Sequence, residues 1–153
     1  MKVSELLKPE FVIPELKGET KEDIINELID LFKNDPRIED IEKVRSSVLD
    51  REKVMSTGVG KGFAIPHGKT NAVKEIVGAF GKIKEGIDYD ALDGNPVHLV
   101  FLLVGKDNLI STHIKLLSRI SRLMNKDDFR HRLTEANSSD EIVKLLLKKK
   151  NTF

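Results

Sequence analysis

One run of hydrophobic residues restricts the fold of this chain more than any other segment. Leu99 to Val104 reads Leu-Val-Phe-Leu-Leu-Val, an unbroken hydrophobic run in which the Val and Phe residues favour strands. The run is far too short to cross a bilayer, which needs about 20 residues in a helix. Because successive side chains of a strand point to opposite faces of the sheet, a strand without alternation is buried on both faces. We therefore expect a central strand with helices on both sides of its sheet.

A second strand is predicted from Ile76 to Ile83, a β-branched and hydrophobic run separated from the first by turn-forming residues between Asp88 and Pro96. Hydrophobic residues at helical spacing predict two helices before the strands. Thr20 and Asp40 stand where they can cap the amino termini of these helices.

Three helices are predicted after the strands. Ser111 is the expected cap of the first, residues 125–136 form the second, and Ser138 with Glu141 makes a capping box for the third. Together the elements predict an α/β fold, and at 153 residues the chain fits a single domain over residues 1–153.

Composition excludes several classes of partner and chemistry. The 26 Lys and Arg residues nearly balance the 25 Asp and Glu residues, so no overall field favours nucleic acid or an anionic membrane. The chain has no cysteine, which excludes disulfides and thiolate ligands and fits a reducing compartment. Charges within Met1–Pro9 do not match a signal peptide. We expect a cytoplasmic protein that does not insert into the membrane.

A glycine-rich stretch from Ser56 to Gly68 is the main candidate for a functional site. Its backbone N–H groups can converge on an anion, and Pro66 stiffens the segment that leads to His67. We therefore expect His67 to meet phosphate. The expected phosphoryl-binding residues are Thr57, Gly58, Gly60 and Gly62.

Two nucleotide-binding motifs fail in this stretch. A Walker A loop needs glycine five positions before Gly68, where this chain has Phe63, and the spacing of Gly58, Gly60 and Gly62 is one residue too short for a dinucleotide fingerprint. The remaining alternative to a phosphate site is a glycine-rich hairpin loop with an exposed histidine.

A histidine that meets phosphate can itself accept a phosphoryl group, since neutral imidazole has a nucleophilic nitrogen near physiological pH. Such a transfer needs groups that stabilise charge on phosphate oxygens. Arg51 and the helix that carries His113 can supply them. By spacing alone, however, Arg51 also suits a helix carboxyl end and His113 suits a half-buried helix position. No two histidines have His-x-x-x-His spacing, so we expect neither a metal nor another cofactor.

Several segments, taken in order, resemble the enzyme IIA domain of the fructose and mannitol class of the bacterial phosphoenolpyruvate-dependent sugar phosphotransferase system. The resemblance extends from Ser4–Leu7 to the last helix. The segments that carry it are Arg51-Glu52, Ser56 to Gly60, Gly62 to His67, Asp93 to Val97 and His113 to Leu117.

The resemblance implies a mixed central sheet with helices on both faces and a phosphotransferase role. In this family His67 would accept a phosphoryl group from the phosphorylated carrier HPr and pass it to a cysteine of a IIB domain, and through IIB the relay would reach a membrane IIC component. Arg51 and His113 match the residues that support the active histidine. Gly105 to Thr112 and Lys61 depart from the family pattern, which leaves the identity of the carrier and of IIB open.

Two other functions remain open from the sequence. A nitrogen-regulatory IIA-type phosphoprotein is similar in sequence but acts by binding other proteins, and the site residues do not separate it from a transport relay. A phosphate-binding or metal-dependent hydrolase that uses His67 and His113 is the alternative from another class. The sugar and the oligomeric state are not indicated.

Overall fold

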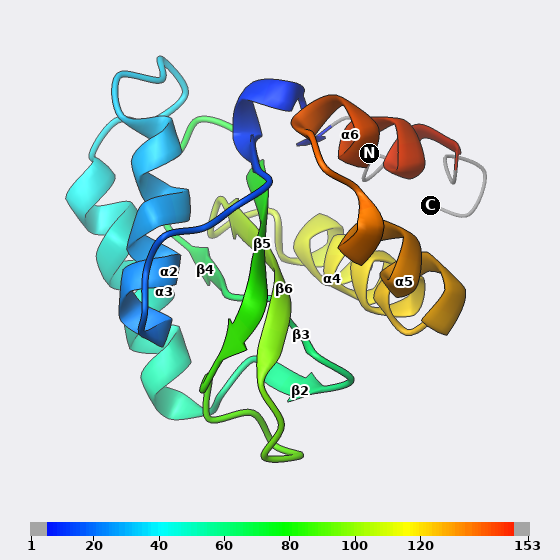
Figure 1. The fold of residues 1–153 in the computed structure, drawn as a ribbon. Coiled ribbons are helices and arrows are strands. Elements are labelled where there is room, and N and C mark those ends of the chain that lie inside the picture. Colours follow the sequence, from blue (N-terminus) through cyan, green and yellow to red (C-terminus); the bar gives the residue numbers. More distant parts are fainter. Residues whose placement is uncertain (1–5, 149–153) are drawn as a thin grey trace.

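The computed structural model describes residues 6–148, in which a mixed sheet of six strands lies between two layers of helices (Figure 1). The strand order is β1-β5-β6-β3-β2, and β4 also pairs with β6. The strands are β1 (Val12–Ile13), β2 (Gly58–Gly60), β3 (Phe63–Ala64), β4 (His67–Lys69), β5 (Val77–Ile87) and β6 (Val97–Gly105). The predicted α/β fold is confirmed.

The central position of β6 explains its hydrophobic sequence. β6 is antiparallel to β5 and parallel to β3 and β4. Its alternate residues enter two separate cores: Val100, Leu102 and Val104 join one, and Leu99, Phe101 and Leu103 join the other. Both faces of the strand are therefore covered, as the unbroken run predicts.

The first core lies between the sheet and two helices, α2 (Lys21–Ile29) and α3 (Ile41–Val54). Both predicted caps are confirmed: the hydroxyl oxygen of Thr20 accepts from the Asp23 N–H at 3.1 Å, and a carboxylate oxygen of Asp40 accepts from the Glu42 N–H at 3.0 Å. Short 3-10 helices lie at Pro9–Phe11 and Asp30–Phe32.

The second core lies between the sheet and three helices, α4 (Ile110–Met124), α5 (Asp127–Glu135) and α6 (Ser139–Lys148), on the opposite side of the sheet from α2 and α3 (Figure 1). The predicted cap at Ser138 is confirmed, since its hydroxyl oxygen accepts from the Glu141 N–H at 3.2 Å. None of the helices described in residues 6–148 is long and apolar enough to cross a membrane.

The prediction that Ser111 caps α4 is wrong. The helix begins two residues earlier, with Leu109 at the N-cap in a non-helical conformation and no side-chain cap bond. Ser111 therefore lies inside the first turn. The hydrophobic periodicity places this helix correctly, but it does not determine the residue at which the chain enters the helical conformation.

Candidate functional site

His67 begins β4, a strand that pairs with β6. His67 lies opposite Leu103, and in a parallel pair such neighbours point to the same face of the sheet. Because Leu103 enters the core beneath α4, the side chain of His67 points toward α4 as well. The sheet thus places a half-buried histidine beside the start of a helix.

The imidazole of His67 is oriented by its own chain segment. Its Nδ1 lies 2.9 Å from the carbonyl oxygen of Ile65, which can only accept, so Nδ1 carries the proton and Nε2 is left free. Burial lowers the pKa of His67, the bond to Ile65 opposes this, and the positive charge of Arg51 lowers the pKa further. Near neutral pH the ring is therefore largely uncharged, with its lone pair on Nε2.

His113 lies next to His67, with a ring-centroid separation of 5.6 Å and an interplanar angle of 55°. The residue is 2% exposed, and neither of its ring nitrogens has a hydrogen-bond partner. Burial, together with the charges of His67 and Lys69, lowers the pKa of His113 to about 4. It is therefore a neutral imidazole whose donor and acceptor are both unused, which is costly in a protein interior.

Arg51 lies in the last turn of α3, and its Nη1 donates to the carbonyl oxygen of Met55 at 2.8 Å. This bond is the structural role that its helix-end position predicts. The same guanidinium is close enough to His67 for its charge to lower the pKa of the imidazole. Arg51 thus both bonds the backbone that follows α3 and places a positive charge near His67.

Thr57 does not leave its polar groups free for a ligand. Its N–H and its hydroxyl both donate to the buried carboxylate of Glu52, at 2.9 and 2.6 Å, and the hydroxyl oxygen lies 3.1 Å from the hydroxyl of Tyr89. The Gly58 N–H donates to the hydroxyl oxygen of Ser56 at 3.1 Å. These groups stabilise the loop from the inside in this structure.

The expectation that Gly60 and Gly62 bind phosphate beside His67 is not supported by their position. They form the turn between β2 and β3, and β3 starts opposite Leu99 of β6, whereas His67 is opposite Leu103. Four residues along a strand correspond to about 13 Å. The structure brings together His67, His113 and Arg51, and it leaves the tip of the glycine-rich hairpin at the other end of the sheet.

Two residues near His67 were not singled out for a role in the site by the sequence. Lys69 is exposed, and its positive charge lowers the pKa of both His67 and His113. It stands two residues after His67 in the same strand, so the alternation of a strand could have placed it on the same face. Glu52 is buried, which is unusual for an acidic residue near the carboxyl end of a helix. The position of Glu52 at the end of a predicted helix could therefore have indicated a special role from the sequence.

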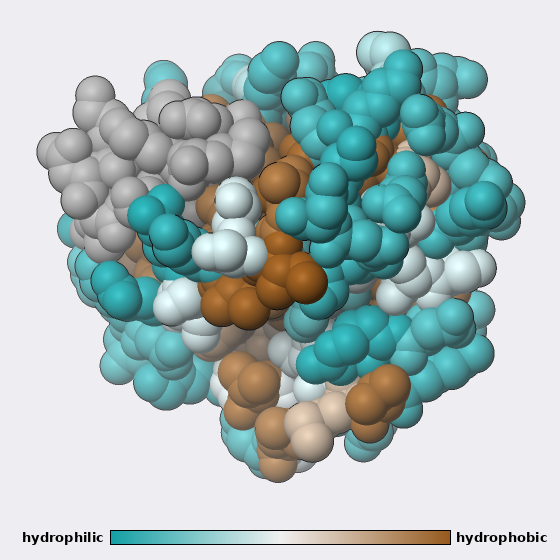
Figure 2. All heavy atoms as spheres, turned by 180° about the vertical axis from the view of Figure 1, so that it is seen from behind, coloured by the Kyte–Doolittle hydropathy of each residue, from teal (hydrophilic) through white to brown (hydrophobic). Residues whose placement is uncertain are grey.

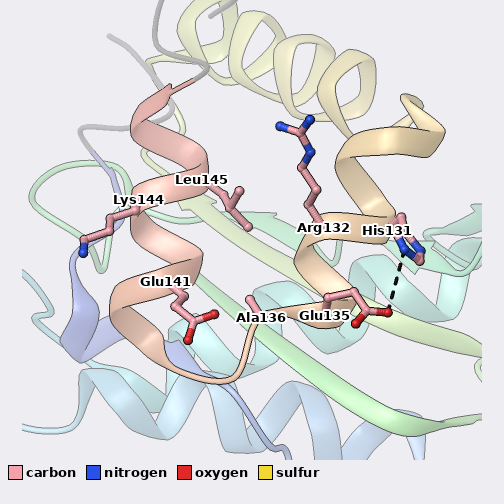
Figure 3. Close-up of a pocket in the computed structure, with 7 residues that line it drawn as sticks. All are labelled: His131, Arg132, Glu135, Ala136, Glu141, Lys144 and Leu145. Atoms are coloured by element: carbon pink, nitrogen blue, oxygen red, sulfur yellow. Dashed lines mark ion pairs between the residues drawn. The ribbon is translucent and has the colours of Figure 1, made fainter.

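A groove between α5 and α6 lies on elements that do not contribute to the His67 site (Figure 3). His131 on its wall is paired with Glu135 at 3.7 Å, and Arg132 is paired with Asp128 at 3.4 Å. These side chains are largely exposed and occupied by one another, so we assign no function to this groove.

Fold and site together define a class of protein: an α/β domain that presents one histidine, with a free ring nitrogen, between an arginine and a second, buried histidine. The match to known families is equally specific. Residues 5–149 match the model of the family described as phosphoenolpyruvate-dependent sugar phosphotransferase system, EIIA 2. The chain belongs to this family, and the resemblance noted in the sequence is confirmed.

Relatives of two kinds are similar to this chain. The fructose-specific EIIABC component of Bacillus subtilis is 37% identical over 95% of this chain, which spans 23% of that longer protein. A nitrogen regulatory protein of Bradyrhizobium diazoefficiens is 35% identical, over 95% of each chain. The crystal structure of the nitrogen regulatory protein IIA-Ntr from Neisseria meningitidis superposes with a TM-score of 0.87 at 30% identity, covering 94% of this chain and 98% of that one.

Proposed function

We propose that this protein is a phosphoryl carrier that accepts a phosphoryl group on Nε2 of His67 from phosphorylated HPr and passes it to a cysteine of a IIB domain. The observation that carries the proposal is the bond from Nδ1 of His67 to Ile65, which leaves the lone pair of an uncharged ring on Nε2. Membership of the IIA family supports this choice of chemistry.

The transfer is balanced without a cofactor. The lone pair of Nε2 attacks phosphorus, the N–P bond of the donor phosphohistidine breaks, and its electron pair returns to the donor imidazole. In the second step a IIB thiolate attacks the phosphorus on His67, an S–P bond forms, and the electron pair of the broken N–P bond returns to Nε2. His67 keeps its Nδ1 proton throughout, donated to Ile65.

The neighbours of His67 supply what phosphoryl transfer requires, which is positioning and stabilisation of charge on the equatorial oxygens. Arg51 contributes a permanent cation with N–H donors beyond the one that Met55 uses. His113 contributes a neutral N–H donor without a protein partner. The amino terminus of α4 has no side-chain cap, so its first N–H groups can also face an anion.

Exposed hydrophobic side chains support protein partners. They lie at the end of α3, in β2 and its neighbouring loop, and at the start of α4, and Figure 2 shows hydrophobic surface grouped in the middle and at the lower end of the rear face. Such patches are typical of interaction sites. The residues are Val54, Met55, Val59, Leu92, Leu109, Ile110 and Ile114.

A IIB domain as acceptor is further supported by a relative of the same fold. The mannitol IIA of Escherichia coli, described in complex with phosphorylated IIB, superposes with a TM-score of 0.79 at 23% identity. Because the carrier meets donor and acceptor at one histidine, we propose that HPr and IIB dock in turn on the exposed hydrophobic side chains at the end of α3 and the start of α4, the elements that carry Arg51 and His113.

The second candidate is a regulatory phosphoprotein, and the similarity to nitrogen regulatory proteins over nearly the full length of the chain favours it. Both functions use the same phosphorylated histidine, so the site geometry does not separate them. Neighbouring genes for IIB and IIC components would favour transport, and a neighbouring gene for the nitrogen sigma factor would favour regulation.

Intact mass measurement after incubation with phosphoenolpyruvate, enzyme I and HPr tests the proposed acceptor. Wild type should gain one phosphoryl group, and His67→Ala should gain none because the substitution removes the nitrogen that we propose as the acceptor. His131→Ala is the matched control, since His131 is exposed and paired with Glu135, and it should be phosphorylated like wild type. Wild type that gains no phosphoryl group from any competent HPr would end the proposal.

A further inference from the structure

Glu52 is buried near the carboxyl end of α3, where helix stability gives no reason for an acidic residue. It is 7% exposed, and α3 ends two residues later at Val54. The negative end of a helix macrodipole disfavours a carboxylate, and burial removes the water that would solvate its charge. The position must therefore be explained by what the side chain binds.

The carboxylate of Glu52 accepts four hydrogen bonds. Oε2 accepts from the Thr57 N–H at 2.9 Å and from Nζ of Lys21 at 3.1 Å, and Oε1 accepts from the Thr57 hydroxyl at 2.6 Å and from the Tyr89 hydroxyl at 3.2 Å. Two of the four donors belong to Thr57. Glu52 thus holds the backbone and the side chain of one loop residue at the same time.

Thr57 is connected in turn to the imidazole of His67. The Ile65 N–H donates to the carbonyl oxygen of Thr57 at 3.3 Å, and the carbonyl oxygen of Ile65 accepts from Nδ1 of His67 at 2.9 Å. Pro66 lies between Ile65 and His67 and has a fixed φ. The carbonyl group of Ile65 therefore has little freedom to rotate relative to His67. A continuous set of hydrogen bonds therefore runs from Glu52 through Thr57 and Ile65 to His67.

We propose that Glu52 is a positioning residue for His67: through Thr57 and Ile65 it holds the carbonyl oxygen that accepts the Nδ1 proton, and so keeps Nε2 free and in one orientation. The inference rests on the proposed function of His67 as the phosphoryl acceptor. It assigns a role to a residue that touches neither the imidazole nor a transferred group. Movement of the Ile65 carbonyl would make the two neutral tautomers more equal and allow the ring to turn.

The charge of Glu52 provides an additional readout. It raises the pKa of His67, against burial and the positive charges of Arg51 and Lys69, which lower it. Replacement of the carboxylate by a neutral amide should therefore lower the pKa of His67. The effect on the tautomer can be measured separately from the effect on the pKa of His67. At a pH above this pKa the ring is uncharged, and only the position of its single proton differs.

The test is ring-nitrogen NMR of the unphosphorylated protein labelled with 15N-histidine, together with steady-state transfer kinetics. Wild type should show the Nδ1–H tautomer of His67, and Glu52→Gln should show a mixture, because an amide cannot accept at both ends. We expect kcat to fall about tenfold, as for other residues that orient a functional histidine, and KM to change less than about twofold. Glu42→Gln is the matched control: it removes an exposed carboxylate from the first turn of the same helix and should match wild type.

An unchanged tautomer ratio in a folded Glu52→Gln variant overturns the proposal, even if transfer slows. Should that variant fail to fold, Thr57→Val serves in its place, because it removes the hydroxyl contacts to Glu52 and Tyr89 and keeps the N–H bond to Glu52. It should shift the ratio in the same direction by a smaller amount, and no shift would equally contradict the proposal. The tautomer measurement does not require phosphorylation, so its outcome is independent of the mass experiment on wild type.

Discussion

At the scale of single residues, the site depends on two histidines that are both held uncharged. His67 is half-buried near Arg51, and His113 is buried without any partner for its ring nitrogens. Both conditions disfavour the imidazolium form. An uncharged pair is suited to accept a phosphoryl group on one ring and to donate a hydrogen bond to it from the other.

The lowered pKa of His113 predicts a loss of stability in acid. The folded-state pKa is about 4 against an ordinary value of 6.5, so the unfolded chain binds a proton first as the pH falls. The stabilising contribution is complete above 6.5 and is lost as the pH falls toward 4. Between about pH 7 and about pH 4.5 wild type should lose about 2 kcal/mol more unfolding free energy than His113→Gln. Urea unfolding at both pH values measures the difference, and equal losses in the two proteins would contradict the prediction.

The residues of the site differ in how far the sequence could identify them. His67, Arg51 and His113 follow from an ordered motif, so the family resemblance names them. The sequence does not show that the ring nitrogens of His113 lack hydrogen-bond partners, because this depends on which atoms surround the ring in the folded protein. The hydrogen bonds of Thr57 could not be predicted for the same reason, since its donors face a carboxylate that only the folded loop brings near.

At the scale of elements, the approach of β6 to α4 determines where His113 sits. A Cβ atom on Gly105, the last residue of β6, would lie 2.8 Å from Nδ1 of His113 and 3.4 Å from Cγ1 of Ile76. Contacts this close leave room only for a glycine unless the ring moves. The strand end therefore serves as the surface against which the imidazole of His113 is held.

Gly105→Ala should accordingly displace the ring of His113. We expect a loss of about 1–3 kcal/mol in unfolding free energy from overpacking, together with slower phosphoryl transfer. Gly94→Ala is the matched control, because its Cβ would meet no atom within 4 Å although φ is +75°. It should cost about 1 kcal/mol through backbone strain and leave the transfer rate unchanged. If the transfer rate falls equally in the two variants, displacement of the His113 ring is not the cause, and the prediction is wrong.

The register of the β2–β3 hairpin could not be predicted from the sequence. The spacing of the glycines correctly predicts a turn, and a hairpin loop is one of the two interpretations that the sequence allows. Which strand the hairpin joins, and at which height, depends on its pairing with β6. For this reason Gly60 and Gly62 could be recognised as turn residues but could not be placed relative to His67.

At the scale of the whole molecule, β6 separates two cores, one on each face of the sheet. Leu102 belongs to the core under α2 and α3 and is 0% exposed, and Leu103 belongs to the core under α4 to α6 and is also 0% exposed. Two adjacent positions of a strand are rarely both buried unless helices cover each face of the sheet. The site at His67 lies where the second of these layers meets the strand β4.

The double coverage predicts that neighbouring positions of β6 are equally sensitive. Leu102→Ala and Leu103→Ala should each lower the unfolding free energy by about 2–5 kcal/mol, measured by urea denaturation. Val59→Ala is the control, since Val59 is 53% exposed and should change stability by less than about 0.5 kcal/mol. Tolerance at one of the two leucine positions would mean that one face of the strand is less covered than the structure shows.

The sequence by itself determined the layers of this protein and pointed to His67 as the histidine that we propose to be reactive. Strand and helix periodicity, caps such as Thr20 and Asp40, and the motif around His67 are properties of residues near one another in the chain. Only the tertiary structure decided which residues meet His67. The connection from Glu52 through Thr57 and Ile65, and the placement of His113 against Gly105, depend on strand register and helix packing, which no local pattern encodes.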